Sequence, residues 1–341
     1  MKSLIECVPN FSEGRDRSVI DAIVDAIGSV DGTRVLHVDR GEAANRTVVT
    51  AVGERECLEE SAYLGIARAA RLIDMRAHKG THPRIGAIDV CPFVPIGKTS
   101  MTDCIAMAGN LGSRVGQELG IPVYLYAEAA HDDNRRSLPA IRAGEYERLS
   151  DKLTDPRFAP DFGPTEFNTM SGATVIGARR ILIAWNVNLN TKDVSVAKEI
   201  AGRLRSSGAR TESGERTPGR FRSLQGDGWY IDEFGCAQVT FNILNYHTTP
   251  LANVFDACKV EAESLGVEVT GSELVGMVPK EVLVTAGRHY SGEYLDESAL
   301  VAEAVEHLGL GELTPFKPTR RVFEFAFEVG TCDDRDLPGY F

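Results

Sequence analysis

The stretch ILIAWNV, residues 181–187, is a short and mostly apolar run of the kind that forms a buried β-strand. Helical and extended patterns alternate in the segments that follow it. The expected elements are a helix at 194–204, strands near 228–231 and 237–243, a helix at 251–265 and a strand at 267–270. The second half of the chain is therefore predicted to have the order β-α-β-β-α-β.

The first half of the chain shows the same order of patterns. Its expected elements are a strand at 4–8, a helix at 19–27, strands at 34–39 and 47–52, a helix at 54–70 and a strand at 88–94. In a motif with this order the helices pack on one face of an antiparallel sheet. We predict an α+β protein with two ferredoxin-like (β-α-β-β-α-β) subdomains side by side, residues 1–180 and 181–341.

Composition and charge narrow the class of protein. A chain of 341 residues suits two domains, and its formal net charge of −12 disfavours nucleic-acid binding, which needs a basic face. The N-terminus lacks a signal-peptide pattern, and no apolar run reaches the roughly 18 residues that span a membrane. The seven cysteines include no CxxC pair. We expect a cytoplasmic protein with reduced thiols and with no membrane or nucleic-acid partner.

Two irregular segments interrupt the predicted elements. Residues 151–172 are dense in Pro, Gly and Asp and are longer than most connections in compact domains, which indicates a linker or a binding loop. Residues 206–219 are rich in Arg and Gly and are expected to form an exposed loop.

The segment RAHKGTHPRIGAIDVCPFVPI, residues 76–96, is rich in basic and titratable side chains and is expected to form a loop that leads into a strand. His78 and His82 can accept and return protons near neutral pH, and Lys79 and Arg84 can hold a carboxylate. The i, i+4 spacing of the histidines would suit zinc only on a helix, which Gly80 makes unfavourable. With no HExxH, GxGxxG or GxSxG motif in the chain, we expect no metal site, nucleotide loop or serine nucleophile.

Several longer phrases resemble one known family, the glutamate formiminotransferases, over nearly the whole chain. These phrases are CVPNFSEG (7–14), NRTV (45–48), LIDMRAHKGTHPRIGAIDVCPFVPI (72–96), PVYLYAEAA (122–130), LPAIRAGEYE (138–147), APDFGP (159–164), GATVIGAR (172–179) and DGWYIDE (227–233). The resemblance implies two ferredoxin-like subdomains and transfer of a formimidoyl group from N-formimidoyl-L-glutamate to N5 of tetrahydrofolate, as in histidine degradation. It further implies a homodimer. Because the chain ends at Phe341, it is similar to the stand-alone transferase, whose product a separate cyclodeaminase would convert.

The resemblance also assigns site residues. The histidine of the HPRxGAxD phrase is His82, which is expected to be catalytic, with His78 and Asp39 as possible supporting residues. The expected folate-binding residues are Gly163, Pro164, Thr165, Glu166, Phe167, Asn168, Thr169, Met170, Ser171 and Gly172. The candidates for holding substrate carboxylates are Lys79, Arg84, Arg179 and Arg180.

Two alternatives remain open on sequence alone. The same pocket could transfer a formyl group from N-formylglutamate to give 5-formyltetrahydrofolate, since the two donors differ only in O for NH. A non-catalytic folate-binding protein is the second alternative, although His82 within its complete phrase disfavours it.

Overall fold

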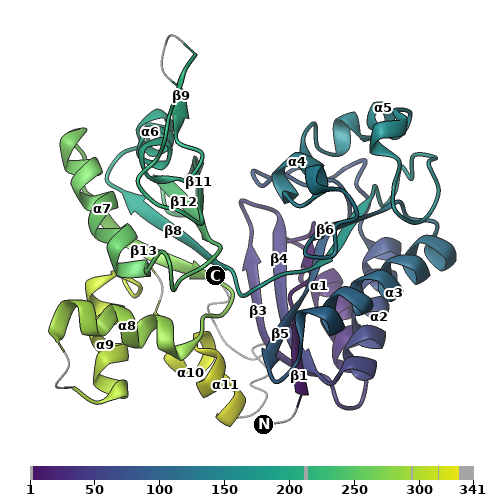
Figure 1. Ribbon diagram of the computed structural model, residues 1–341, viewed down its shortest axis with the longest axis horizontal. Coiled ribbons are helices and arrows are strands. Elements are labelled where there is room, and N and C mark those ends of the chain that lie inside the picture. Colours follow the sequence, from purple (N-terminus) through teal and green to yellow (C-terminus); the bar gives the residue numbers. More distant parts are fainter. Residues whose placement is uncertain (1–2, 211–213, 293–294, 314, 330–341) are drawn as a thin grey trace. The chain divides into compact units, whose positions relative to one another are not determined.

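The computed structural model describes residues 3–210, 214–292, 295–313 and 315–329, which form two compact units that divide between Arg180 and Ile181 (Figure 1). Each unit combines a sheet with packed helices, so the predicted α+β class is confirmed. The part of the chain that the structure describes includes no helix both long and apolar enough to cross a membrane.

The first unit begins with the predicted order of elements. These elements are β1 (Ser3–Cys7), β2 (Asn10–Phe11), α1 (Arg17–Gly28), β3 (Arg34–Gly41), β4 (Arg46–Gly53), α2 (Arg55–Leu72) and β5 (Ile88–Gly97). β1 lies between β4 and β5, and β3 pairs with β4 on the outer side; all of these pairs are antiparallel. This part of the sheet is the ferredoxin-like motif.

The first unit then extends its sheet with two parallel strands that were not predicted. β7 (Thr174–Ala178) pairs with β5, and β6 (Val123–Ala127) pairs with β7. The remaining elements of the extension are α3 (Met101–Leu119), η1 (Asp133–Arg135), α4 (Leu138–Arg142), η2 (Tyr146–Arg148), α5 (Leu149–Leu153) and η3 (Pro156–Phe158). Because β7 belongs to this sheet and follows residues 151–172, the interpretation of that segment as a linker between the halves is wrong.

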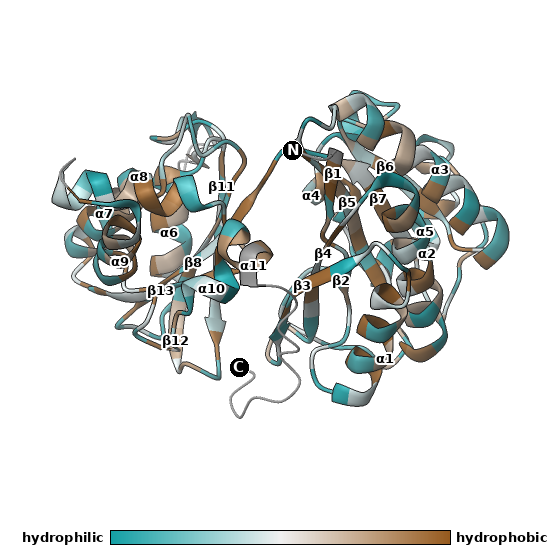
Figure 2. Cartoon of the chain, turned by 90° about the horizontal axis from the view of Figure 1, so that it is seen from below, coloured by the Kyte–Doolittle hydropathy of each residue, from teal (hydrophilic) through white to brown (hydrophobic). Residues whose placement is uncertain are grey.

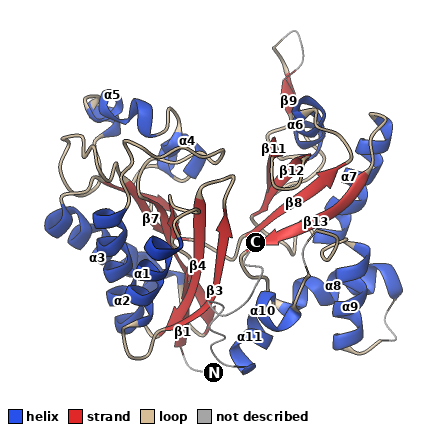
Figure 3. Cartoon of the chain, turned by 180° about the vertical axis from the view of Figure 1, so that it is seen from behind, coloured by secondary structure: helices blue, strands red, loops and turns tan. Residues whose placement is uncertain are grey.

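Local sequence explains where the helices begin and how they pack. At the start of α3, Ser100 and Asp103 form a capping box in which each side chain binds the other residue's backbone N–H. Asp16 caps α1 by accepting from Ser18 and Val19. Figure 3 shows α1, α2 and α3 on one side of the sheet, and Figure 2 shows hydrophilic and hydrophobic residues alternating along the helices. Their apolar faces build the core of this unit.

The second unit has the predicted order without an extension of its sheet. Its elements are β8 (Ile183–Leu189), α6 (Val194–Leu204), β9 (Ala209–Arg210), β10 (Arg216–Thr217), β11 (Leu224–Ile231), β12 (Cys236–Ile243), α7 (Leu251–Ser264), β13 (Val269–Val275), α8 (Lys280–Ser291), α9 (Glu297–His307), α10 (Pro318–Arg321) and α11 (Phe323–Val329). The sheet order is β11-β12-β8-β13, again antiparallel throughout. Trp185 is fully buried in the core, with its ring 5.8 Å from Phe255 and 6.1 Å from Phe241.

Two predictions about the second unit need correction. The last strand is longer and later than expected, because β13 continues to Val275 and pairs along most of β8. The segment 206–219 is more ordered than an irregular loop, since β9 and β10 pair as a short antiparallel ribbon. Residues 211–213, between β9 and β10 in the sequence, lie outside the described residues.

Candidate active site in the first unit

His82 lies in the irregular segment between α2 and β5. Residues 73–87 are irregular, so His78 and His82 lie on a loop, as their sequence predicts. His82 is half-buried, and its Nδ1 lies 2.7 Å from the carbonyl oxygen of Pro83. Because a carbonyl oxygen can only accept, Nδ1 carries the proton in the neutral ring, and the lone pair is on Nε2.

A buried ionic network centres on Asp89 in β5. Asp89 is fully buried, and its carboxylate accepts from Arg46 Nη1 at 2.6 Å and from both Nε (3.2 Å) and Nη2 of Arg142. The backbone N–H of Ile85 donates to Asp89 Oδ1 at 3.1 Å. Arg46 also donates from Nη2 to Asn10 Oδ1 at 2.7 Å. Two guanidinium groups therefore share one carboxylate, and the network has a net positive charge.

This network acts on the protonation of His82. Burial lowers the pKa of His82 well below its ordinary value of 6.5, and the positive charges of Arg46 and Arg142 lower it further. Asp89 opposes this effect but is itself neutralised by the arginines. Burial alone would raise the pKa of Asp89, yet its interactions with Arg142 and Arg46 bring that pKa below the usual range. At neutral pH the network thus contains an ionised Asp89 beside a neutral His82.

Arg84, on the other side of the same loop, is held by two glutamates. Its Nη1 donates to Glu145 Oε2 at 3.0 Å and to Glu147 Oε2 at 2.7 Å, and its Nη2 donates to Glu147 Oε1 at 2.6 Å. The backbone N–H of Tyr146 also donates to the Arg84 carbonyl at 3.0 Å. Arg84 was predicted to hold a substrate carboxylate, but in the structure these internal carboxylates take the donors that such a substrate would need.

His78 connects Arg84 to the start of β4. Its Nδ1 accepts from Arg84 Nε at 3.2 Å, so the ring proton must lie on Nε2, which donates to the Asn45 carbonyl at 2.9 Å. Burial lowers the pKa of His78, and the charge of Arg84 acts in the same direction. Both ring nitrogens are thus used in a neutral ring. This arrangement suits a supporting residue that holds the loop.

The lowered pKa of His78 gives a testable pH dependence of stability. Since the folded protein binds this proton less readily than the unfolded chain, protonation favours unfolding once the pH falls below the unfolded pKa of about 6.5. We expect the free energy of unfolding to decrease between about pH 7.5 and pH 5.5, and to decrease less steeply in His78→Gln. Urea unfolding of both proteins at several pH values measures this, and parallel pH profiles would contradict it.

The expected folate segment begins and ends at glycines that the backbone requires. Gly163 and Gly172 have φ of +82° and +68°, in the left-handed region that glycine favours. A Cβ atom would lie 2.4 Å from the Ile121 carbonyl oxygen at Gly163 and 2.3 Å from the Ile85 carbonyl oxygen at Gly172. No residue with a side chain fits either position without movement of the backbone.

The C-terminal end of this segment binds directly to the loop that carries His82. The backbone N–H of Ala87 donates to Ser171 O at 2.8 Å, and the N–H of Met75 donates to Met170 O at 2.9 Å. Near its centre, the ring of Phe167 packs 5.3 Å from that of Tyr146. The candidate folate segment and the candidate catalytic loop therefore form one connected structure within the first unit.

Arg179 comes directly after β7. It interacts with buried Glu6, whose pKa burial raises to about 6 against the opposing charge of Arg179. Burial likewise raises the pKa of Tyr126, and both Arg179 and Arg142 oppose that shift. Arg179 and the network residue Arg142 therefore act on the same phenol group.

The other predicted residues are more peripheral. Lys79 and Arg180 are exposed. Asp39 lies on β3, and its Oδ2 is 3.7 Å from Nε2 of His37 on the same strand. Within the described ranges, no three His, Cys, Asp or Glu side chains gather as metal ligands would.

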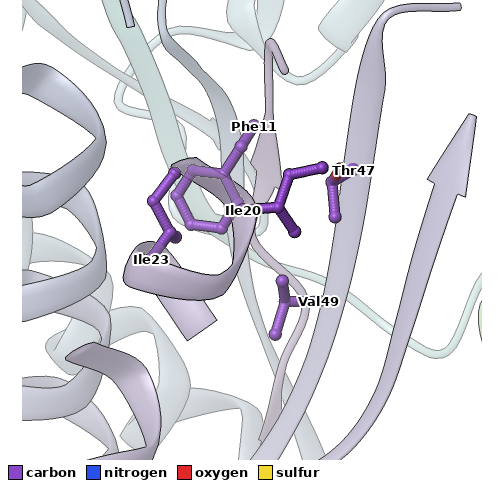
Figure 4. Close-up of a pocket in the computed structure, with 5 residues that line it drawn as sticks. All are labelled: Phe11, Ile20, Ile23, Thr47 and Val49. Carbon is purple, nitrogen blue, oxygen red and sulfur yellow. The ribbon is translucent and has the colours of Figure 1, made fainter. Parts of the chain in front are cut away.

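A small recess elsewhere in the first unit is mostly apolar, unlike the charged surroundings of the His82 loop. It is lined by Phe11, Ile20, Ile23, Thr47 and Val49 (Figure 4). Four of these side chains are apolar and belong to the packing between α1 and the sheet. The recess offers no titratable group for catalysis.

The sequences of both units match the models of one family. The model of the formiminotransferase domain, N-terminal subdomain, matches residues 4–179, and that of the formiminotransferase domain matches residues 184–328. The chain belongs to the formiminotransferase family.

Named relatives of this formiminotransferase chain fall into two groups. Formimidoyltransferase-cyclodeaminase of Rattus norvegicus is 47% identical over 330 residues, which are 95% of this chain and 60% of that protein. Glutamate formimidoyltransferase of Thermoplasma acidophilum is 42% identical over 84% of this chain and 92% of that protein. The Streptococcus pyogenes protein of the same name is 36% identical over 85% and 94%. The chain thus spans about three-fifths of the first group and most of the second.

Sequence reasoning missed the charged residues that surround the His82 loop. Arg46, Asp89 and Arg142 were not predicted to belong to the site, although each lies inside a phrase that resembles the family: NRTV, RIGAID and LPAIRAGEYE. The sequence did offer one signal for them: each is a charged residue within a phrase that is otherwise typical of a buried strand or the end of a helix. Their convergence on one carboxylate became apparent only in the folded formiminotransferase chain.

Proposed function

We propose that this protein transfers the formimidoyl group of N-formimidoyl-L-glutamate to N5 of tetrahydrofolate, giving 5-formimidoyltetrahydrofolate and L-glutamate. The observation that carries the proposal is the neutral His82, whose Nδ1 is held by the Pro83 carbonyl, in a loop bonded to the candidate folate segment. The names of the Thermoplasma and Streptococcus relatives support the same reaction.

The reaction is an amidine exchange through a tetrahedral carbon. N5 of tetrahydrofolate forms a bond to the formimidoyl carbon and loses a proton, and the bond from that carbon to the glutamate nitrogen breaks as this nitrogen gains one. Nε2 of His82 can take the first proton and return it to the leaving nitrogen, which is general base and then general acid catalysis. Holding both substrates together contributes further by fixing their orientation.

The folate is expected to lie along residues 163–172, with Arg179, Lys79 and Arg180 as candidates for substrate carboxylates. Arg84 is assigned here to positioning, because it is paired with Glu145 and Glu147. We also propose a cytoplasmic homodimer. Its product would be converted by a separate cyclodeaminase, as the relatives named only as transferases suggest.

Donor preference distinguishes this function from its alternatives. A protonated amidine gives a tetrahedral carbon that carries a neutral nitrogen, whereas a formamide gives an oxyanion that needs dedicated donors. We therefore expect kcat/KM for N-formimidoylglutamate to exceed that for N-formylglutamate by about tenfold or more, or at least about 1.4 kcal/mol. Steady-state rates with each donor and tetrahydrofolate measure this ratio. The reverse preference would favour formyl transfer, and saturable folate binding without turnover would favour a binding protein.

A further inference from the structure

The turn between β3 and β4 is bonded to the loop that carries His82. The two strands pair as a hairpin (Figure 3), and its turn closes with a hydrogen bond from the backbone N–H of Asn45 to the Glu42 carbonyl at 3.1 Å. The backbone N–H of Thr81, the residue before His82, donates to the carbonyl of Ala43 in this turn at 3.2 Å. The chain that leads into His82 is therefore attached to the hairpin.

Asn45 supplies the side chain that completes this attachment. Its Nδ2 donates to the carbonyl of Lys79 at 3.0 Å, and its Oδ1 accepts from the backbone N–H of Gly14 at 2.9 Å. Since a backbone N–H can only donate and a carbonyl can only accept, both ends of the amide are fixed. Asn45 is buried, and its own carbonyl accepts from His78 Nε2 at 2.9 Å. One residue thus holds the loop at both His78 and Lys79.

The backbone of the turn suits asparagine and lies directly against the loop. Asn45 has φ of +48°, in the left-handed region, which asparagine adopts more readily than most residues with a side chain. A Cβ atom at Gly80 would be 2.1 Å from the Ala44 carbonyl oxygen and 2.9 Å from the Asn45 Cβ. The loop and the turn therefore pack backbone against backbone, and movement of one would displace the other.

We propose that Asn45 is a positioning residue for His82: its side-chain amide fixes the backbone of residues 79–81 and thereby the place at which the imidazole meets the two substrates. For its catalytic meaning this inference rests on the proposed function. Asn45 needs no contact with a substrate, because it acts through the three residues that precede His82. The candidate folate segment is bonded to the loop elsewhere, at Met75 and Ala87, so folate affinity should depend little on Asn45.

Asn45→Asp tests the bond to Lys79 in particular. The carboxylate keeps an acceptor for the Gly14 N–H but turns an oxygen towards the Lys79 carbonyl, which can only accept. We expect the amide hydrogen of Thr81 to exchange with solvent about tenfold faster or more, whereas that of Ala87, at the end of the loop, should exchange as in wild type. Hydrogen exchange followed by NMR in the intact protein without substrates measures both rates.

Kinetics and calorimetry report how the loosened loop affects function. In Asn45→Asp, kcat for formimidoyl transfer should fall by about tenfold or more, while the affinity for 5-formyltetrahydrofolate should stay within about twofold of wild type. In a His82→Ala background the same substitution should change kcat by less than about threefold, because the side chain that Asn45 positions is already absent. A merely structural effect would lower kcat by the same factor in both backgrounds.

Asn190→Asp in the second unit is the matched control. Asn190 is exposed, and its amide likewise accepts from a backbone N–H, that of Glu268 at 2.8 Å, and donates to an oxygen, Oε2 of the same glutamate at 3.5 Å. Thr81 exchange and kcat in this variant should match wild type. If Asn45→Asp does not fold, Asn45→Gly takes its part, because glycine keeps the left-handed backbone and removes both side-chain bonds.

Two results would overturn the proposal. One is wild-type exchange of the Thr81 amide in the Asn45 variant, and the other is an equal loss of kcat with and without His82. Absence of formimidoyl transfer by the wild type would overturn the proposed function instead. Exchange at Thr81 needs no turnover, so it would then decide alone whether Asn45 holds the loop.

Discussion

His82→Ala should fold normally and retain much of its affinity for folate, but its kcat should fall by a factor of about 10² to 10⁴. The size of the loss follows from the usual contribution of general acid and base catalysis by one side chain. Affinity should be largely kept because proton transfer stabilises the transition state more than the bound ground state. His82 lies in the irregular segment between α2 and β5, so truncation of its side chain leaves the helices and strands of the unit in place. Single-turnover rates and calorimetric titration with 5-formyltetrahydrofolate measure the two effects separately.

His78→Ala provides the comparison within the same loop. His78 bonds Arg84 and the Asn45 carbonyl with its two nitrogens, so its loss should loosen the loop and reduce kcat by less than His82→Ala does. If His82→Ala retained more than about a tenth of wild-type kcat, the loss of activity would be smaller than the proposed proton transfer requires. The role of base would then pass to His78 or His37.

The ferredoxin-like cores could be predicted because their signals are local. The continuous apolar run ILIAWNV indicates a buried strand, and the 3.6-residue spacing of apolar side chains from Val19 to Ile27 indicates a helix. The extension of the first sheet could not be found in this way. β7 pairs in parallel with β5 and β6, and such a pairing depends on partners distant in sequence, which periodicity does not identify.

The candidate site could likewise be predicted from the sequence only where its signal is local. The density of histidine and basic residues in 76–96 identified the loop, but the same density suggested that Arg84 was available to a substrate. Its partners, Glu145 and Glu147, lie 61 and 63 residues further along the chain. A pairing over such a separation is created by folding, because the left-handed turn at Gly144 and Glu145 directs the two carboxylates back to the loop.

Gly172→Ala should be the most disruptive single-methyl change in the candidate folate segment. Alanine would have to adopt φ near +68°, which costs an L-residue roughly 1–2 kcal/mol, and its Cβ would lie 2.3 Å from Ile85 O and 2.8 Å from the Gly86 Cα. Both contacts are with backbone, so a side-chain rotation cannot relieve them. We expect a loss of about 3 kcal/mol or more in the free energy of unfolding, which is large for one methyl group.

Gly266→Ala separates the steric effect from the backbone effect. Gly266 has φ of +74°, but its Cβ would meet no atom within 4 Å, so alanine there should cost only the roughly 1–2 kcal/mol of the left-handed conformation. The excess loss in Gly172→Ala then reports the contact with the Ile85–Gly86 backbone, the stretch that also leads from Asp89 to His82. Displacing this stretch should weaken binding of 5-formyltetrahydrofolate by about tenfold or more, or about 1.4 kcal/mol. Urea unfolding and calorimetry measure the two losses. Equal stability of the two variants, with wild-type folate affinity in Gly172→Ala, would mean that residues 163–172 and the His82 loop do not act as one site.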